Sequence, residues 1–168
     1  QIVFQDPYGS LSPRMTVGEI VGEGLEVHFD LNKKQKDDRI ADCLKAVEIN
    51  PDLRFKYPHE FSGGQRQRIS IARALASRPK ILICDESVNM LDASVKIEIL
   101  ELLRVFQEKM NLTIIFITHD LGIAKRFCDR LLVMNHGKIV DEGESSTIFT
   151  KTQNTYTKSL LNSSLNLN

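Results

Sequence analysis

The sequence predicts an α/β fold around a buried parallel sheet. Apolar runs of strand length occur at Ile81 to Cys84 and at Thr113 to Ile117, and an amphipathic helical pattern from Ala93 to Met110 separates them. Continuous apolar strands joined by a helix are typical of a buried parallel sheet. Two more strand-length runs follow, at Leu131 to Met134 and at Lys138 to Val140. A chain of 168 residues suffices for one domain with a core, or for one domain with a small added lobe.

The first half of the chain favours helices. Ile2 to Phe4 has the apolar character of a strand end, and the Pro-, Gly- and Ser-rich stretch from Gln5 to Pro13 favours a loop. Apolar residues at helical spacing then predict a lobe of three helices, over Val17 to Phe29, Lys36 to Ile49 and Gly64 to Ser77. Ser62 and Asp92 are the expected N-caps of the helices that follow them. The helix from Ala93 should bury one side, formed by Ile99, Leu102, Leu103 and Phe106.

Composition excludes several classes of protein. Lys plus Arg and Asp plus Glu both number 22, so the net charge of zero provides no basic field for nucleic acid. The three cysteines, Cys43, Cys84 and Cys128, form no C-x-x-C pair, which favours a reducing compartment without disulfides or a zinc site. No apolar run approaches the ~20 residues of a membrane-spanning helix. We expect a soluble chain that ends in a short helix from Tyr156 to Leu161 and a frayed tail from Asn162 to Asn168.

The strongest local signal is the string FSGGQRQR, residues 61–68, at the start of a predicted helix. Gly63 and Gly64 allow close backbone approach to an anion, Ser62 offers a hydroxyl, and the helix N-terminus supplies free N–H groups and a favourable dipole. A capped helix start after a glycine turn is the ordinary interpretation of Ser-Gly-Gly alone. The whole string instead favours a phosphate-binding end.

Carboxylates follow the predicted strand Ile81 to Cys84. Asp85 and Glu86 stand where α/β sheets place their ligands, and alternate strand residues point opposite ways. One carboxylate can hold Mg²⁺ while its neighbour orients or deprotonates an attacking water. A solvated turn is the ordinary alternative for an isolated Asp-Glu pair. The buried strand Thr113 to Ile117 repeats the design and leads through Thr118 into His119, a candidate for reaching a terminal phosphate.

Taken together, these residues are similar to those of the nucleotide-binding subunits of ABC transporters, over nearly the whole chain. The resemblance implies a P-loop NTPase (RecA-like) parallel sheet core with an inserted ABC-type α-helical subdomain, and ATP and Mg²⁺ as cofactors. It makes Gln5 the Q-loop glutamine, Ser62 to Gln65 the signature motif, Asp85 the magnesium-binding Walker B aspartate, Glu86 the catalytic glutamate, Asp92 the D-loop aspartate and His119 the switch histidine. Gln5 thereby becomes both a catalytic residue and a Mg²⁺ ligand, and Asp92 joins the signature motif in nucleotide binding.

The resemblance also implies partners and a location. Two such subunits, identical or not, pair head to tail, so Ser62, Gly63 and Gly64 would serve a partner's ATP. The strings QDPYGSL (5–11), YPHEFSGGQ (57–65) and YTKSLL (156–161) resemble the ATPases of dipeptide, oligopeptide and nickel importers. Such subunits lie on the cytoplasmic face of the bacterial plasma membrane, bind membrane permease subunits and act indirectly with a solute-binding protein.

The chain departs from the family in two places. It has no phosphate loop of the form G-x-x-x-x-G-K-[ST], because its Gly-Lys, Gly137-Lys138, lies in a strand-rich stretch too late in the chain. We therefore expect an ABC domain truncated at its N-terminus, with unpaired backbone, exposed apolar surface and marginal stability. The second departure is Ser87 to Met90, where Met90 replaces a small residue and is expected to crowd the subunit interface.

These interpretations divide the partial ABC ATPase domain into four segments: 1–5, the end of a core strand and the Q-loop; 6–77, the helical subdomain with the signature motif; 78–150, the catalytic core; and 151–168, a C-terminal tail. The predicted function is an importer subunit that couples ATP hydrolysis to transport, with hydrolysis requiring an intact subunit. Two alternatives remain: a non-catalytic remnant that supplies only the signature half-site, and a soluble ABC ATPase of translation or DNA repair.

Overall fold

A three-stranded parallel sheet organises the first part of the molecule, in a computed structural model that describes residues 1–6 and 9–165. Its strands are β1 (Ile2–Val3), β2 (Ile81–Asp85) and β3 (Thr113–Ile117), in the order β1-β2-β3. Val3 pairs with Cys84 and Asp85 pairs with Ile117, so the carboxyl ends of neighbouring strands meet at one edge. The predicted α/β fold with a parallel sheet is confirmed.

Only one face of this sheet is buried. Val3, Leu82 and Cys84 are fully inaccessible. Their neighbours along the strands face the other way, and large apolar side chains on that side stand in solvent: Ile2 (41% exposed), Ile81 (49%), Ile115 (48%) and Ile117 (47%). The prediction that the strand from Thr113 is buried is wrong, because its residues are half-buried on one face and exposed on the other. The predicted exposed apolar surface is confirmed.

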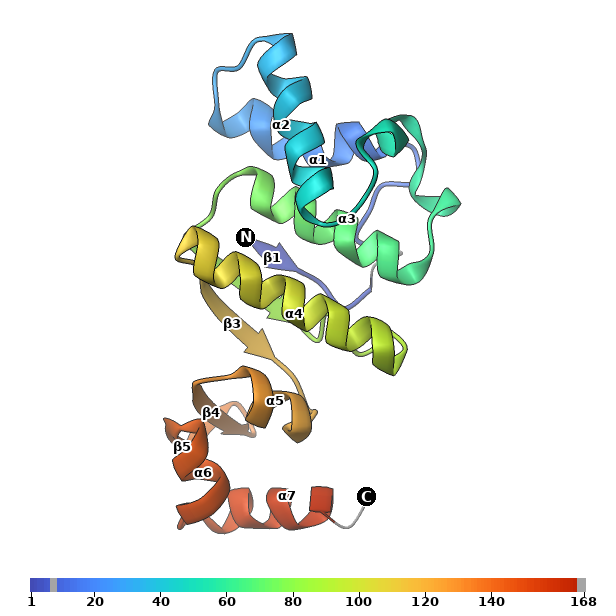
Figure 1. Ribbon diagram of the computed structural model, residues 1–168. Helices are drawn as coiled ribbons and strands as arrows, with labels where there is room; N and C mark the ends of the chain where they lie inside the picture. Colours follow the sequence, from blue (N-terminus) through green and yellow to red (C-terminus); the bar gives the residue numbers. More distant parts are fainter. Residues whose placement is uncertain (7–8, 166–168) are drawn as a thin grey trace. The chain divides into compact units, whose positions relative to one another are not determined.

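The helical lobe consists of α1 (Val17–His28), α2 (Lys33–Ala46) and α3 (Gly63–Ala76), with both α1 and α2 packed against α3 (Figure 1). α1 and α3 lie within one residue of their predicted bounds. α2 begins and ends three residues earlier than predicted. It starts at Lys33 because Asn32 and Gln35 form a capping box, and the left-handed φ of 60° at Glu48 prevents its continuation.

The segment between α2 and α3 is more regular than predicted. Sequence patterns indicate a loop around Tyr57-Pro58, but the structure has two short 3₁₀ helices, η1 (Pro51–Phe55) and η2 (Pro58–Glu60). Each begins with a proline, whose fixed φ suits a first helical position. This segment leads directly into Ser62, the N-cap of α3.

Helix α4 (Ala93–Met110) matches its predicted bounds. Its buried stripe is the predicted one, formed by Ile99, Leu102, Leu103 and Phe106. The helix ends at Asn111, which adopts a left-handed φ of 50°. The prediction that Asp92 is the N-cap of this helix is confirmed, although its side chain makes no capping hydrogen bond.

The second part of the molecule is a separate unit, Thr118–Asn168. It contains α5 (Leu121–Phe127), β4 (Arg130–Asn135), β5 (Lys138–Glu144), α6 (Ser145–Lys151) and α7 (Thr155–Leu165). The two later predicted strands are confirmed as β4 and β5, which form an antiparallel hairpin in a sheet of their own. α5 and α6 were not predicted. α7 continues through residues expected to be a frayed tail, of which 166–168 lie outside the described residues. No helix in the described part of the chain is long and apolar enough to cross a membrane.

Candidate functional site

Three predicted site residues leave the sheet at the same edge. β1 and β2 run parallel with Val3 beside Cys84, so Gln5 and Glu86 each follow two residues after a paired position. Asp85 is the last residue of β2 and pairs with Ile117 at the end of β3. Asp85 and Glu86 are half-buried, whereas Gln5 is exposed. This register agrees with the prediction that Asp85 and Glu86 lie at the carboxyl edge of a parallel sheet, and it adds Gln5 to the same edge.

The backbone at Glu86 is held in an unusual conformation. Its φ is 47°, in the left-handed region that a residue with a long side chain seldom adopts. The Glu86 N–H donates to the carbonyl of Ile117 at 3.0 Å, and its carbonyl accepts from the N–H of Asn89 at 3.0 Å. These two bonds fix the Glu86 backbone between the end of β3 and the turn that follows β2. At Glu86 the chain leaves the direction of strand β2.

Asp85 is suited to bind a magnesium ion with the coordination that Mg²⁺ usually has in nucleotide sites. This ion keeps several waters and binds one or two carboxylates together with substrate phosphates, so a cage of protein ligands is not required. Among the described residues, no group of three His, Cys, Asp or Glu side chains is placed to hold a metal, and no Lys or Arg forms an ion pair with Asp85. One half-buried carboxylate at a strand end fits the phosphate-shared type of site.

The start of α3 is closed by a reciprocal capping box. The Ser62 hydroxyl accepts from the Gln65 N–H at 3.3 Å, and the Gln65 side-chain oxygen accepts from the Ser62 N–H at 3.1 Å. This confirms Ser62 as the N-cap. The N–H groups of Gly63 and Gly64 belong to the first turn, which has no acceptors within its own helix. Both glycines are partly exposed, so an anion at this helix end would meet two backbone donors.

Gly64 also brings two predicted elements together. A Cβ atom at this position would lie 2.7 Å from Cγ1 of Val95, in the first turn of α4. Only glycine allows this approach of the two helices. Asp92, the N-cap of α4, is three residues before Val95. The start of the FSGGQRQR string and the start of α4 are therefore neighbours.

His119 lies in the second unit, between β3 and α5. The residues on both sides of it are ordered by capping bonds. The Asp120 N–H donates to the Thr118 hydroxyl at 3.0 Å, and the Asp120 carboxylate accepts from the Ile123 N–H at 3.1 Å to cap α5. His119 itself is exposed. Its role toward a terminal phosphate stays a prediction.

The segment Ser87 to Met90 forms consecutive turns between β2 and α4. The Leu91 N–H donates to the Val88 carbonyl at 3.2 Å, while Ser87 and Val88 are buried beneath the turn. Met90 is 63% exposed. Its large side chain thus stands on the surface, and its effect on a subunit interface stays a prediction.

Sequence reasoning did not single out two arginines of the same string. Arg66 donates from Nε to the Pro58 carbonyl at 2.8 Å and from Nη2 to the His59 carbonyl at 3.3 Å, so it holds η2 against α3. Arg68 bonds to residues on both α2's end and α4. The sequence signal for these two arginines is their position among the buried residues of α3. The same pattern is expected for the ordinary solvent-exposed face of an amphipathic helix.

Cys84 marks the dry side of the sheet next to the candidate site. Burial raises the pKa of its thiol from 9.0 to about 12. The thiol therefore stays protonated and unreactive near neutral pH. Cys84 acts as an apolar core residue, while the next residue, Asp85, faces the other way.

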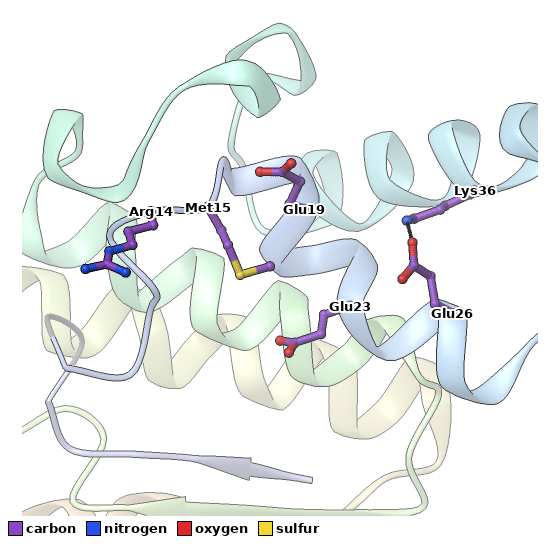
Figure 2. A pocket seen from close by; sticks show the side chains of 6 residues that line it. All are labelled: Arg14, Met15, Glu19, Glu23, Glu26 and Lys36. Carbon is purple, nitrogen blue, oxygen red and sulfur yellow. Dashed lines mark hydrogen bonds and ion pairs between the residues drawn. The ribbon is translucent and has the colours of Figure 1, made fainter.

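A cavity of about 310 Å³ opens on the helical lobe (Figure 2). Its walls come from the segment before α1, from three glutamates of α1, and from α2: Arg14, Met15, Glu19, Glu23, Glu26 and Lys36. Glu26 is paired with Lys36 across the cavity wall. Backbone and hydroxyl hydrogen bonds from Thr16 lower the pKa of Glu19. The walls therefore carry mixed charge with an excess of carboxylates.

Comparison with known proteins places these features in one family. The family described as ABC transporter matches residues 1–89. The chain is 50% identical over 168 residues to the peptidoglycan transport ATP-binding protein YejF of Agrobacterium fabrum, covering 99% of this chain and 31% of the relative. It is 45% identical to the oligopeptide transport ATP-binding protein OppF of Bacillus subtilis and 47% identical to the dipeptide transport ATP-binding protein DppF of Lactococcus lactis. These two matches cover 96% and 97% of this chain, and 53% of each relative.

Solved structures show the same fold. CbiO1 of Clostridium perfringens, part of the ABC transporter complex cbiONQ, superimposes with a TM-score of 0.79 at 33% identity, over 99% of this chain and 62% of that one. The ATP-binding cassette MJ0796, solved as a dimer in a post-hydrolysis state with ADP and Pi, gives a TM-score of 0.73 at 30% identity. That match covers 86% of this chain and 63% of the other. The chain thus spans between about a third and about two thirds of the proteins that it matches.

Proposed function

The chain belongs to the ABC transporter family, and from this premise we propose that it is part of an ATP-binding and ATP-hydrolysing subunit of an importer for oligopeptides or dipeptides. The observation that carries the catalytic part is the parallel register of β1 and β2, which takes Gln5, Asp85 and Glu86 out of the sheet at one edge. The names of the relatives support peptide import.

The residues at this edge have separable roles. Asp85 and Gln5 would hold Mg²⁺, which supplies charge neutralisation at the phosphates when it is bound. Glu86, fixed by its backbone bonds to Ile117 and Asn89, would orient or deprotonate the attacking water. His119 would contact the terminal phosphate. The capped, partly exposed first turn of α3 would bind phosphate through Ser62 and its following residues, Gly63, Gly64 and Gln65.

A second ATPase subunit is the proposed direct partner. The start of α3 and Asp92 lie close together through Gly64 and Val95, and Asp92 is not used as a capping side chain. This arrangement supports a head-to-tail pair, of identical or different subunits, in which Ser62, Gly63, Gly64 and Asp92 face a nucleotide bound by the other subunit. The dimeric state of MJ0796 with ADP and Pi is consistent with such a pair.

Permease subunits are the proposed membrane partners. The cavity on the helical lobe offers a recess between α1 and α2 that an inserted segment of another protein can fill (Figure 2). Its excess of carboxylates favours a segment that carries Lys or Arg. We place the subunit on the cytoplasmic face of a bacterial membrane, with a solute-binding protein acting indirectly. We also propose the division into segments 1–5, 6–77, 78–150 and 151–168, with the helical subdomain transmitting motion.

A chimaera tests the catalytic proposal. In the Bacillus subtilis relative, the region that matches this chain over 162 residues is replaced by this chain. We expect ATP turnover that falls by about 10²- to 10⁴-fold on Glu86→Gln, with ATP binding retained, because a positioned base or water-orienting group is lost. Equal loss of binding and turnover would make Glu86 structural and contradict the proposal.

The same assay on the isolated chain tests the main alternative. A binding module that supplies only the signature half-site has no turnover by itself but associates with an ATP-loaded second subunit. ATP hydrolysis by the 168-residue chain alone, removed by Glu86→Gln, would exclude that alternative. Ser62→Arg, which places a bulky charge at the exposed start of α3, is expected to block ATP-dependent association without unfolding the chain.

A further inference from the structure

Arg68 connects three separate helical elements. Its Nη1 donates to the Val47 carbonyl at 3.2 Å and to a Glu48 carboxylate oxygen at 2.7 Å. Its Nη2 donates to a Glu98 carboxylate oxygen at 3.0 Å. Arg68 belongs to α3, Val47 and Glu48 follow the end of α2, and Glu98 belongs to α4. One guanidinium group therefore bonds to the helical lobe and to the helix that joins β2 to β3.

This side chain is much less exposed than its partners. The Arg68 side chain is 11% exposed, whereas those of Glu48 and Glu98 are 72% and 57% exposed. A charge removed from water to this extent needs hydrogen-bonded partners of opposite charge. Glu48, moreover, adopts a left-handed φ of 60°. The environment of Arg68 therefore depends on all three bonds and not on one exposed ion pair.

A second contact between α3 and α4 lies one turn closer to the helix starts. Gly64 on α3 packs against Val95 on α4, with no room for a Cβ atom. Gly64 and Arg68 are four residues apart, and Val95 and Glu98 are three apart, so each pair lies on one face of its helix. The two contacts form a double attachment between the first two turns of α3 and those of α4.

We propose that Arg68 is a positioning residue that holds the first turns of α3 and α4 as one rigid body. It thereby presents Ser62 to Gly64 and Asp92 together toward the second subunit's nucleotide, a role that rests on the function proposed above. Arginine is required because its planar fork directs separate N–H groups at acceptors on different elements, which one ammonium group does not reproduce. Arg68→Lys keeps the charge and removes this geometry.

Amide hydrogen exchange in the intact 168-residue chain tests the positioning role directly. The Arg66 N–H closes the first turn of α3 on the Ser62 carbonyl at 2.9 Å, and the Lys96 N–H closes that of α4 on the Asp92 carbonyl at 2.8 Å. We expect Arg68→Lys to speed exchange of the Lys96 and Arg66 amides by about 5- to 30-fold. This is the increase in the local opening equilibrium that follows when about 1–2 kcal/mol of local stabilisation is lost. Glu98→Gln, at an exposed carboxylate that folding tolerates, should speed Lys96 exchange similarly.

Matched controls separate positioning from general destabilisation. Glu101→Gln makes the same change at an exposed glutamate of α4 and should leave both amides unchanged. The Ile20 amide, bonded to the Thr16 carbonyl at 3.0 Å in α1, reports on the helical lobe and should also stay unchanged. The double variant Arg68→Lys with Glu98→Gln should show no further increase at Lys96, because both changes weaken the same charge-assisted hydrogen bond.

Two results would overturn the proposal: unchanged exchange at Lys96 in Arg68→Lys and Glu98→Gln, or an equal increase at Ile20. In the chimaera, Arg68→Lys should weaken ATP-dependent association at least 5-fold while ATP binding stays unchanged, and full association would contradict the role toward the second subunit. If the wild-type chimaera shows no ATP-dependent association with a second subunit, that result counts against the proposed function alone. The hydrogen-exchange result still decides whether Arg68 joins the starts of α3 and α4.

Discussion

The two faces of the central sheet are built from similar side chains but have opposite fates. On one face Val3, Leu82 and Cys84 are completely buried, and on the other Ile81 and Ile115 are about half exposed. Strand β2 contributes to both faces within five residues. An apolar strand sequence therefore does not by itself show which of its faces is buried. In this chain, the contacts that cover one face of the sheet decide which side chains are shielded from water.

Truncation of a buried residue should have the largest effect. Leu82→Ala is expected to lower the free energy of unfolding by about 2–5 kcal/mol, because it removes buried surface and leaves a cavity. Ile115→Ala on the exposed face should lower it by less than about 1 kcal/mol. Urea denaturation of both variants measures the difference. Similar losses for the two variants would mean that both faces are covered in solution.

The Cys84 thiol reports how dry the buried face is. Its folded pKa of about 12 lies above the unfolded value of 9.0, so its contribution to stability is complete below pH 9 and is lost as pH rises toward 12. At pH 10 the unfolded thiol ionises and the folded one does not, which lowers the free energy of unfolding by about 1 kcal/mol.

Denaturation at pH 7.5 and pH 10 under reducing conditions measures this loss. In Cys84→Ala the decrease between the two pH values should be smaller by that amount, because other titrating groups are unchanged. An identical pH dependence in the variant would mean that water reaches the thiol and that the buried face is less well sealed than its exposures indicate.

Charge on the exposed face should have the smallest effect on stability. Ile117→Lys is expected to change the free energy of unfolding by no more than about 0.5 kcal/mol, the usual range for surface positions. It should reduce self-association in sedimentation velocity, because it interrupts an exposed apolar patch. Thr113→Lys adds the same charge at an exposed polar position of the same strand and is the matched control. A large loss of stability in Ile117→Lys alone would show that this face is packed.

Much of the first unit could be predicted from local patterns. The stripe of α4, the strands β2 and β3 and the Ser62 cap follow from periodicity and capping chemistry, and the shared strand edge of Asp85 and Glu86 follows from the parallel arrangement. Where prediction failed, another local signal had more weight. The Asn32 capping box sets the start of α2, and the apolar residues Val47 and Ile49, which continue the helical pattern, lie beyond its end.

Other features depend on tertiary contacts or on unusual turn residues. The β4–β5 hairpin turns through His136 and Gly137, with φ of 46° and 75°, and histidine at the first of these positions is a weak signal for such a turn. The bonds of Arg68 join segments 20 and 30 residues away along the chain. No sequence pattern distinguishes that arginine from its neighbour Arg66, because both interrupt the same apolar stripe.

The left-handed backbone of Glu86 implies that folding stability and the proposed catalytic role favour different residues at this position. Glycine, which adopts such angles freely, or asparagine, which tolerates them, would relieve the conformational strain there, yet neither provides the carboxylate. Screening random variants for heat resistance alone should therefore enrich replacements of Glu86, and these would be inactive in the proposed reaction. The acid is retained at a position where the fold by itself would favour a different residue.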